Sequence, residues 1–255
     1  SPVYASVIFA IAESPVEGGL IWTGSNDGLV QLTRDGGDTW EDVTPNIPDL
    51  PPWGTVSNIE PSRFDPAVAY VTVDFHQSGD THPYVYKTED FGRSWRSLAT
   101  DIPRSVFSYA HVIREDPSRP GLLYLGTENS VFVSFNDGMT WLPLQGDLPH
   151  APAYWLTVQT HFNDLVVGTY GRGFWILDDI TPLQQLTDEV VASEVHLFEP
   201  RAAYRFLPRE GRNSQPGDPA AGENPTFGAS INFYLGEGTG GRAQVMITTE
   251  SGEQV

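Results

Sequence analysis

The chain has 255 residues and a formal net charge of −19, from 33 Asp and Glu against 14 Lys and Arg. Nucleic-acid and anionic-membrane binders need a basic surface that releases counterions, so this charge excludes both kinds of partner for the free chain. The sequence has no cysteine, which excludes disulfides, thiolate metal sites and a Cys nucleophile.

The composition favours an all-β protein. Gly and Pro are abundant, at 25 and 21 residues, and aromatic residues make up 12% of the chain. Such a composition is typical of many short strands joined by tight turns. No stretch of about 18 apolar residues is present, so we expect no membrane insertion. Lys87 is the only lysine; a GC-rich genome and an acid-rich surface adapted to salt both remain open as explanations.

An eight-residue pattern, [Ser/Thr]-x-[Asp/Asn]-x-Gly-x-[Ser/Thr]-Trp, occurs three times, at 33–40, 88–95 and 134–141. The spacing is close to the roughly 40–50 residues of a propeller blade. We call each occurrence a clip. The residues that match the defined positions of the pattern are Asp35, Gly37, Thr39 and Trp40 in the first clip, Asp90, Gly92, Ser94 and Trp95 in the second, and Asn136, Gly138, Thr140 and Trp141 in the third.

The physics of a clip is local. The Asp or Asn oxygen is expected to accept hydrogen bonds from backbone N–H groups one and two residues further on and so to close a turn. Gly supplies a backbone conformation that a β-carbon would penalise, and the Trp ring covers the turn. We therefore interpret the clips as structural and expect no catalytic role for them.

Short apolar strands surround each clip in the same order, which predicts four-stranded antiparallel units. The expected fold is a β-propeller section of four blades, at about 1–50, 51–103, 104–150 and 151–200. The fourth blade has no clip; we expect a short helical or irregular excursion over 181–193 and a fourth strand over 195–199. A closed four-bladed ring and the C-terminal part of a larger ring are the alternatives, and the need of repeat proteins for closure or caps favours the larger ring.

The composition changes after residue 200. A linker rich in Gly, Pro and polar residues is expected over 201–225. Two alternating segments follow, at 229–235 and 242–248. They predict that 226–255 holds the first strands of an incomplete β-sandwich-like domain.

The clips resemble the Asp-box (BNR) repeats of sialidases, xyloglucanases and sortilin-type propellers. Longer phrases narrow the resemblance to large exported bacterial proteins of the sortilin-N-terminal-like kind, often labelled BNR-repeat glycosyl hydrolases. The phrases are AESP with GLIW and DGLV in 12–30, PYVYKT in 83–88, GRGFWILDD in 171–179, and NP with FGA in 224–229.

This resemblance implies a secreted, periplasmic or cell-surface protein, and leaves the chemistry open, since fold-level likeness does not deliver function. The chain departs from the group's pattern at 154–159, where YWLTVQ stands in place of an expected His and Asp. This departure puts in doubt any role that the His carries in the group.

Ligands of propellers usually lie on the face formed by loops between second and third strands and between blades. On this face the sequence offers seven candidate ligand-binding residues: Trp53, Asp74, His76, Asp80, His82, Tyr170 and Arg172. Each has an ordinary structural alternative. A Trp that covers a blade seam is the favoured alternative for Trp53, and an Asp that fixes a His tautomer is more common than a metal site for the Asp-x-His pairs. For Arg172, pairing with Asp178, Asp179 or a neighbouring blade is as well supported as ligand binding. We expect no metal site and no cofactor.

The sequence carries no signature of paired catalytic carboxylates, and no nucleophile elbow, phosphate loop or HExxH motif. We therefore expect a non-catalytic binding or scaffold propeller of an exported bacterial protein that recognises a peptide, protein or glycan. The alternative is a glycoside hydrolase of the xyloglucanase or sialidase kind whose catalytic acids lie partly outside this chain.

Overall fold

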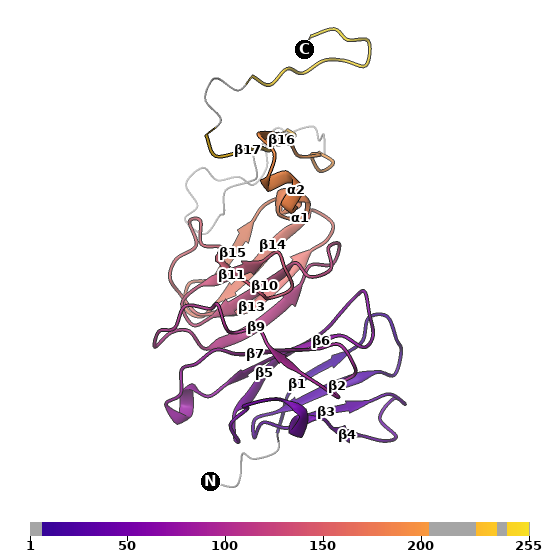
Figure 1. The fold of residues 1–255 in the computed structure, drawn as a ribbon, viewed down its shortest axis with the longest axis vertical. Helices are drawn as coiled ribbons and strands as arrows, with labels where there is room; N and C mark the ends of the chain where they lie inside the picture. The colour runs from indigo at the N-terminus through magenta and orange to yellow at the C-terminus, as the bar shows by residue number, and fades with distance from the viewer. Residues whose placement is uncertain (1–6, 204–227, 239–243, 255) are drawn as a thin grey trace, which may run out of the picture. The chain divides into compact units, whose positions relative to one another are not determined.

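The computed structural model describes residues 7–203, 228–238 and 244–254. It divides into two compact units, Ser1–Ile180 and Thr181–Val255. The described strands of the first unit form four antiparallel sheets (Figure 1). In the first three, each strand pairs with the next one in the chain, which confirms the predicted blade order.

The strands follow the predicted pattern closely, because alternating apolar residues separated by Gly, Pro and Asp turns set both their faces and their ends. Sheet one is β1 (Ile8–Glu13), β2 (Ile21–Ser25), β3 (Val30–Thr33) and β4 (Glu41–Asp42); sheet two is β5 (Thr55–Pro61), β6 (Ala69–Asp74), β7 (Tyr84–Thr88) and β8 (Arg96–Ser97); sheet three is β9 (Ala110–Glu115), β10 (Leu123–Thr127), β11 (Val131–Ser134) and β12 (Leu142–Pro143). Short 3₁₀ helices, η2 (Thr44–Asn46) and η3 (His76–Ser78), lie in the loops.

The fourth sheet has three strands, β13 (Ala153–Gln159), β14 (Asp164–Thr169) and β15 (Phe174–Leu177). The prediction that 195–199 completes it is wrong. That segment forms β16 (Val195–Leu197), which pairs with β17 (Phe233–Leu235) in the second unit. The earlier sheets return the chain through a tight clip, whereas here the chain leaves β15 and enters helices, so no strand is brought back beside β15.

Consecutive sheets pack through apolar cores. The first strands of neighbouring sheets contact each other: β1 with β5, β5 with β9, and β9 with β13. One core joins sheets one and two and includes Trp22, Val56 and Trp95. A second joins sheets two and three and includes Leu98, Ile113 and Trp141. The first strands are therefore innermost in the stack of sheets.

The clips close as hydrogen-bonded turns, by a bond pattern that differs from the predicted one. Asp35 accepts a hydrogen bond from the backbone N–H of Thr39, four residues on, at 2.9 Å, and another from the Thr39 hydroxyl at 2.6 Å. The nearer N–H groups, those of Asp35 and Gly37, donate to the Thr33 hydroxyl at 3.4 and 3.0 Å. Of the two N–H groups expected to donate to Asp35, that of Gly37 thus donates to Thr33, and that of Gly36 donates to the Gly19 carbonyl.

The second and third clips also dock on the preceding sheet. A β-carbon placed on Gly92 would lie 2.9 Å from the side chain of Val43, and one on Gly138 would lie 2.8 Å from Leu98. Val43 and Leu98 each directly follow the last strand of the sheet before. These glycines are therefore required by close packing between blades as well as by their positive φ.

The second unit contains α1 (Thr181–Gln185) and α2 (Asp188–Val191), which confirms the helical segment expected over 181–193. Of the strand predicted at 229–235, only β17 forms. Residues 242 and 243 lie outside the described residues, and an isolated bridge joins Thr248 to Gln254. Most of the predicted linker, from 204 onward, also lies outside the described residues. No described helix combines the length and apolar character needed to cross a membrane.

Candidate ligand-binding site

The first strand of each of the four sheets in the first unit carries a β-bulge near its start. In β1, β5, β9 and β13 the pairing with the second strand skips one residue, which leaves Phe9, Ser57, His111 and Tyr154 as the extra residues. A bulge interrupts the alternation of side chains and re-aims one of them. Since the first strands are innermost, the four bulges present equivalent side chains at one level of neighbouring blades.

Five rings form a continuous series at this level. His76 stacks on Tyr109, with centroids 4.8 Å apart. Tyr109 meets His111 edge to face at 5.3 Å, and His111 stacks on Tyr154 at 4.1 Å. Tyr154 contacts Tyr170 at 5.7 Å. We call these residues the aromatic row; it joins side chains from sheets two, three and four on the loop face, where second strands turn into third strands and one blade leads to the next.

Two carboxylates hold the histidines of the row. Asp74 contacts Nδ1 of His76 at 2.5 Å and accepts the His76 backbone N–H at 2.8 Å. Glu128 contacts Nε2 of His111 at 2.9 Å. Burial, followed by the charge and hydrogen bond of Glu128 and the charge of Asp74, raises the pKa of Tyr109 well above its usual range. Both acids therefore act on the same phenol.

The outer end of the row is open to solvent. Tyr154 is 47% exposed and Tyr170 is 73% exposed. Burial, and then the negative charges of Glu128 and Asp74, raise the pKa of Tyr154. Its phenol is therefore neutral over the physiological range. This end of the row offers ring faces and hydroxyl groups to a ligand, in a negative local potential.

Three of the seven predicted residues belong to this arrangement: His76 and Tyr170 lie in the row and Asp74 supports it. The second predicted pair forms separately, with Nδ1 of His82 2.7 Å from Asp80 and the Tyr84 hydroxyl donating to Asp80 at 2.7 Å. Burial acts against ionisation of Asp80, but the hydrogen bonds from His82 and Tyr84 outweigh it and lower its pKa.

The remaining two candidates lie apart from the row. Trp53 is exposed, with a positive φ, and within the described chain no ring contact joins it to the row. The Arg172 carbonyl accepts a hydrogen bond from the Trp175 indole at 3.0 Å. Its guanidinium forms no salt bridge with a described residue, so the predicted pairing with Asp178 or Asp179 is not formed. The described residues contain no group of three or more side chains arranged to hold a metal ion.

Sequence reasoning missed three residues of the site, Tyr109, His111 and Glu128, and placed Tyr154 on the loop face without assigning it a role. Tyr109 and Glu128 lie in loops, and His111 and Tyr154 are the second residues of β9 and β13. The bulges that re-aim His111 and Tyr154 are visible only in the pairing of the strands. No spacing rule links these residues, because the contacts run between blades.

A second polar cluster lies further along the same inner strands. Arg114 contacts Glu60 of β5 at 3.0 Å, donates to the Leu156 carbonyl of β13 at 2.9 Å, and stacks on the Trp155 ring at 4.4 Å. Glu60, Arg114 and Trp155 line a polar pocket of ≈ 200 Å³. Burial raises the pKa of Glu60 to about 7, although the charge of Arg114 opposes this. Arg114 thus joins the first strands of three sheets below the aromatic row.

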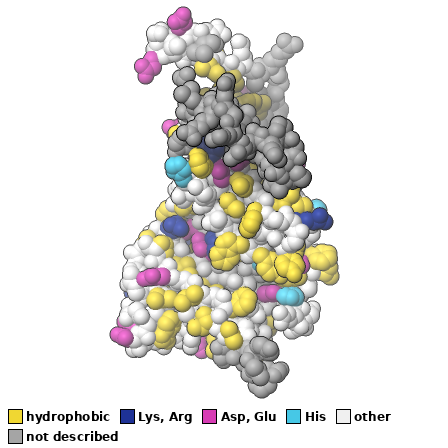
Figure 2. All heavy atoms as spheres, turned by 180° about the vertical axis from the view of Figure 1, so that it is seen from behind, with side chains coloured by type: hydrophobic (Ala, Val, Ile, Leu, Met, Phe, Trp, Pro, Cys, Tyr) yellow, Lys and Arg dark blue, Asp and Glu magenta, His cyan; other side chains and the backbone are white. Residues whose placement is uncertain are grey.

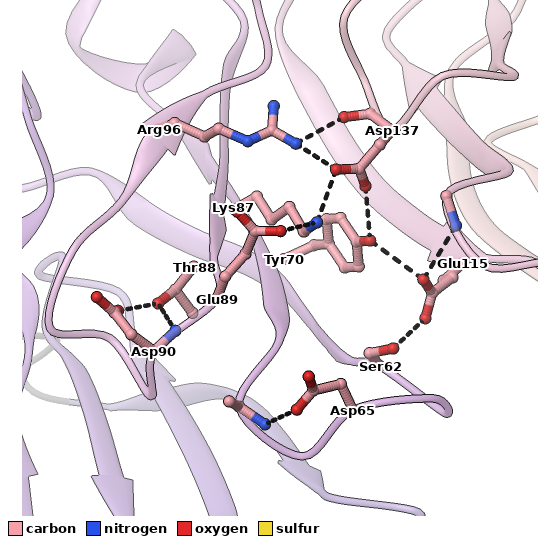
Figure 3. Close-up of polar contacts among 12 residues, drawn as sticks. Ser62, Asp65, Tyr70, Lys87, Thr88, Glu89, Asp90, Arg96, Glu115 and Asp137 are labelled. Carbon is pink, nitrogen blue, oxygen red and sulfur yellow. Dashed lines mark hydrogen bonds and ion pairs between the residues drawn. The ribbon is translucent and has the colours of Figure 1, made fainter.

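A third cluster ties sheet two to sheet three on the clip face (Figure 3). Lys87 is buried and lies 2.6 Å from Asp137, which also pairs with Arg96. The Tyr70 hydroxyl lies 3.0 Å from Asp137 and 3.1 Å from Glu115 (Figure 3). Each of the two acids accepts bonds from sheet two, so this cluster is a structural bridge and offers no free reactive group.

Innermost first strands, four-stranded antiparallel sheets packed through successive cores, and hairpin clips at one end define β-propeller blades. The solved structure of the GH74 xyloglucanase from Xanthomonas campestris is similar, with a TM-score of 0.52 and 14% identity over 69% of this chain and 30% of that one. This likeness shows the fold alone.

Other similar structures include YCF48 bound to D1 peptide, with a TM-score of 0.49 and 18% identity over 70% of this chain and 53% of that one. The extracellular domain of a hybrid two-component system from B. thetaiotaomicron has a TM-score of 0.49 and 17% identity over 69% and 21%. The chain therefore spans about half or less of the length of these structures. No family model and no curated protein matches the chain.

Proposed function

We propose that this chain is a non-catalytic binding or scaffold section of an exported bacterial propeller of the Asp-box, sortilin-like kind, and that it recognises a peptide, protein or glycan. The observation that carries the proposal is the aromatic row, a continuous series of rings from three blades with an open outer end. Aromatic faces with polar tips are the groups that dominate protein recognition surfaces.

The second candidate is a glycoside hydrolase, suggested by the fold likeness to a xyloglucanase. Hydrolysis needs one carboxylic acid that protonates the leaving group and a second carboxylate facing it across the substrate. Asp74 and Glu128 are the acids nearest the row, and each is engaged by an imidazole. This pairing suits acids that orient rings, so it supports binding over turnover.

The test compares the chain with a Tyr154→Ala variant on arrays of peptides and glycans. Tyr154 is exposed, so the variant should fold, and we expect it to lose the binding that the parent shows. Phe64→Ala is the matched control, because Phe64 is a half-exposed aromatic in the loop between β5 and β6, at the opposite ends of the strands.

Hydrolysis of xyloglucan and sialosides is measured in parallel. Turnover that is abolished by Glu128→Gln or Asp74→Asn would replace the binding proposal with the hydrolase. Binding that survives Tyr154→Ala and Tyr170→Ala together would remove the aromatic row as the site, whatever the ligand.

A further inference from the structure

The carboxylates beside the aromatic row give this part of the loop face a negative character. Asp74 and Glu128 both lie against the row, and Asp80 lies in the same blade-two loop. Burial, and then the charges of Glu128 and Asp74, raise the pKa of both Tyr109 and Tyr154. The contacts of Asp74 with His76 and of Glu128 with His111 place two carboxylates directly beside the row, and their charges act on its phenols in addition to burial.

The exposed rings are the chemical complement of a cation. Tyr154 and Tyr170 present electron-rich faces, and Tyr154 lies within the field of both acids. A Lys ammonium or an Arg guanidinium within about 6 Å of such a ring is attracted by its quadrupole, and the attraction grows when the site is partly desolvated. A carboxylate behind the ring adds to the same attraction.

Opposing charges near the row are few. Arg172 lies two residues after Tyr170, and the charge of Arg104 acts on Tyr84, whose hydroxyl donates to Asp80. The imidazoles of His76 and His111 each face an acid. The chain as a whole carries a formal charge of −19. A charge of this size steers cations toward the protein from beyond contact distance and raises their rate of association.

We propose that the aromatic row binds a peptide segment bearing Lys or Arg, whose cationic side chains lie on the Tyr154 and Tyr170 rings. The argument rests on the proposed binding function and adds the charge of the partner. A neutral glycan would contact the same rings but would gain nothing from the carboxylates. The negative charges of Asp74 and Glu128 therefore favour a cationic peptide over a glycan.

The experiment uses fluorescein-labelled peptides of one length that differ only in having Arg, Lys, Gln or Glu at alternate positions, with a xylogluco-oligosaccharide as the uncharged glycan probe. Fluorescence anisotropy measures peptide binding, and calorimetry measures the oligosaccharide. We expect the Arg and Lys peptides to bind at least about tenfold more tightly than the Gln peptide, as two cation–ring contacts imply, and the Glu peptide to bind least.

Two variants locate the effect. Tyr154→Ala should weaken binding of the Arg peptide by about fivefold or more through loss of a ring contact. Glu128→Gln should reduce the preference for the Arg peptide over the Gln peptide. Glu41→Gln is the charge-matched control, because Glu41 is exposed on the outer strand β4, and it should leave the preference unchanged. Raising the salt concentration from about 0.1 to about 1 M shortens the Debye length from about 10 to about 3 Å. Of the four peptides, the Arg peptide should lose the most affinity.

The outcomes separate the two proposals. Equal binding of the Gln and Arg peptides, with loss in Tyr154→Ala, overturns the cationic partner and keeps the row as a peptide site. Binding of the oligosaccharide alone, lost in Tyr154→Ala, overturns the cationic peptide and identifies a glycan site. Absence of binding by every probe at about 1 mM, where weak complexes are still detected, contradicts both.

Discussion

At the scale of single residues, the side-chain oxygen of the clip Asp or Asn accepts the hydrogen bonds that close the turn. Burial of Asp90 opposes ionisation, but the hydroxyl and N–H of Ser94 and the hydroxyl of Thr88 donate to it, and the net effect lowers its pKa. The third clip uses Asn136, whose oxygen accepts the N–H of Thr140 at 2.9 Å. The turn therefore needs an acceptor at this position, and a charge is optional.

We predict that Asp90→Ala lowers the free energy of unfolding by about 1–2 kcal/mol, as the loss of a helix cap does, because backbone and hydroxyl donors lose their acceptor. Urea unfolding measures this. Asp38→Ala, an exposed position within the first clip, should change stability much less. Affinity for a ligand of the aromatic row should stay unchanged in both variants, and a large affinity loss without a stability loss would contradict the structural role.

The Asp90 carboxylate also makes the free energy of unfolding depend on pH in acid. Since the pKa of Asp90 is lower in the folded than in the unfolded state, its contribution is complete above the unfolded pKa of about 3.9 and is lost as pH falls through the folded pKa. We expect Asp90→Asn to retain the turn, as Asn136 does, and to reduce the slope of unfolding free energy between about pH 5 and about pH 2. An unchanged slope would show that Asp90 ionises alike in both states.

At the scale of elements, the residue after the clip Asp or Asn reaches back to the preceding blade. In the second clip Phe91 lies under the Arg34 guanidinium, 3.9 Å from it. In the third clip the equivalent residue, Asp137, takes Lys87 and Arg96 of sheet two. Both residues have positive φ, near 60°. The same positive-φ backbone therefore places Phe91 in a cation–ring contact between sheets one and two, and Asp137 in an ion-pair cluster between sheets two and three.

We predict that Lys87→Met destabilises the chain by about 1–3 kcal/mol, below the full cost of breaking a buried pair because Arg96 still pairs with Asp137. Thermal and urea unfolding measure the effect. A double-mutant cycle with Asp137→Asn should give a coupling above about 0.5 kcal/mol. Additive losses would mean that Lys87 acts through Tyr70 or Glu89 instead.

The fourth sheet shows what a blade lacks when no clip is present. β15 is its outer strand, and all four of its residues are exposed although all four are apolar. An apolar hollow of ≈ 220 Å³ lies beside it, lined by Leu144 and Trp175 among others. Leu144 follows the last strand of sheet three, as Val43 and Leu98 follow theirs. In the earlier blades the next clip covers this position.

At the scale of the whole molecule, stability depends on interfaces between sheets. Trp95 and Trp141 are 8% and 3% exposed because each lies against the preceding sheet, whereas Trp40 of the first clip is 43% exposed. Figure 2 shows hydrophobic side chains gathered in several groups, with acidic and histidine side chains between them, on one face. A further sheet against the first clip would bury Trp40 in the same way; the larger ring stays a prediction.

We predict that Trp141→Ala lowers the free energy of unfolding by about 3–5 kcal/mol, the range for truncating a buried large aromatic. Trp40→Ala, at the equivalent position of the first clip, should cost about 1 kcal/mol, because only part of its surface is buried. Urea unfolding of the two variants gives the comparison. Equal losses would contradict the view that burial against a preceding sheet sets the contribution of the clip Trp.

Local sequence determined the strands and clips of this protein. Alternating apolar residues set the faces of β1 to β15, and Gly, Pro, Asp and Ser set their turns, so each unit was predictable from residues close together in the chain. The same locality explains the error at 195–199, where the pattern predicts a strand but says nothing of its partner.

Tertiary structure alone decided the candidate site. The rings of His76, Tyr109, His111, Tyr154 and Tyr170 come from three blades, and they meet because bulges in successive inner strands fall at one level. A bulge is specified by packing between strands and between sheets, and no short-range spacing encodes it. The sequence therefore predicted His76, Asp74 and Tyr170 as single candidates, while packing between blades joined them into one surface.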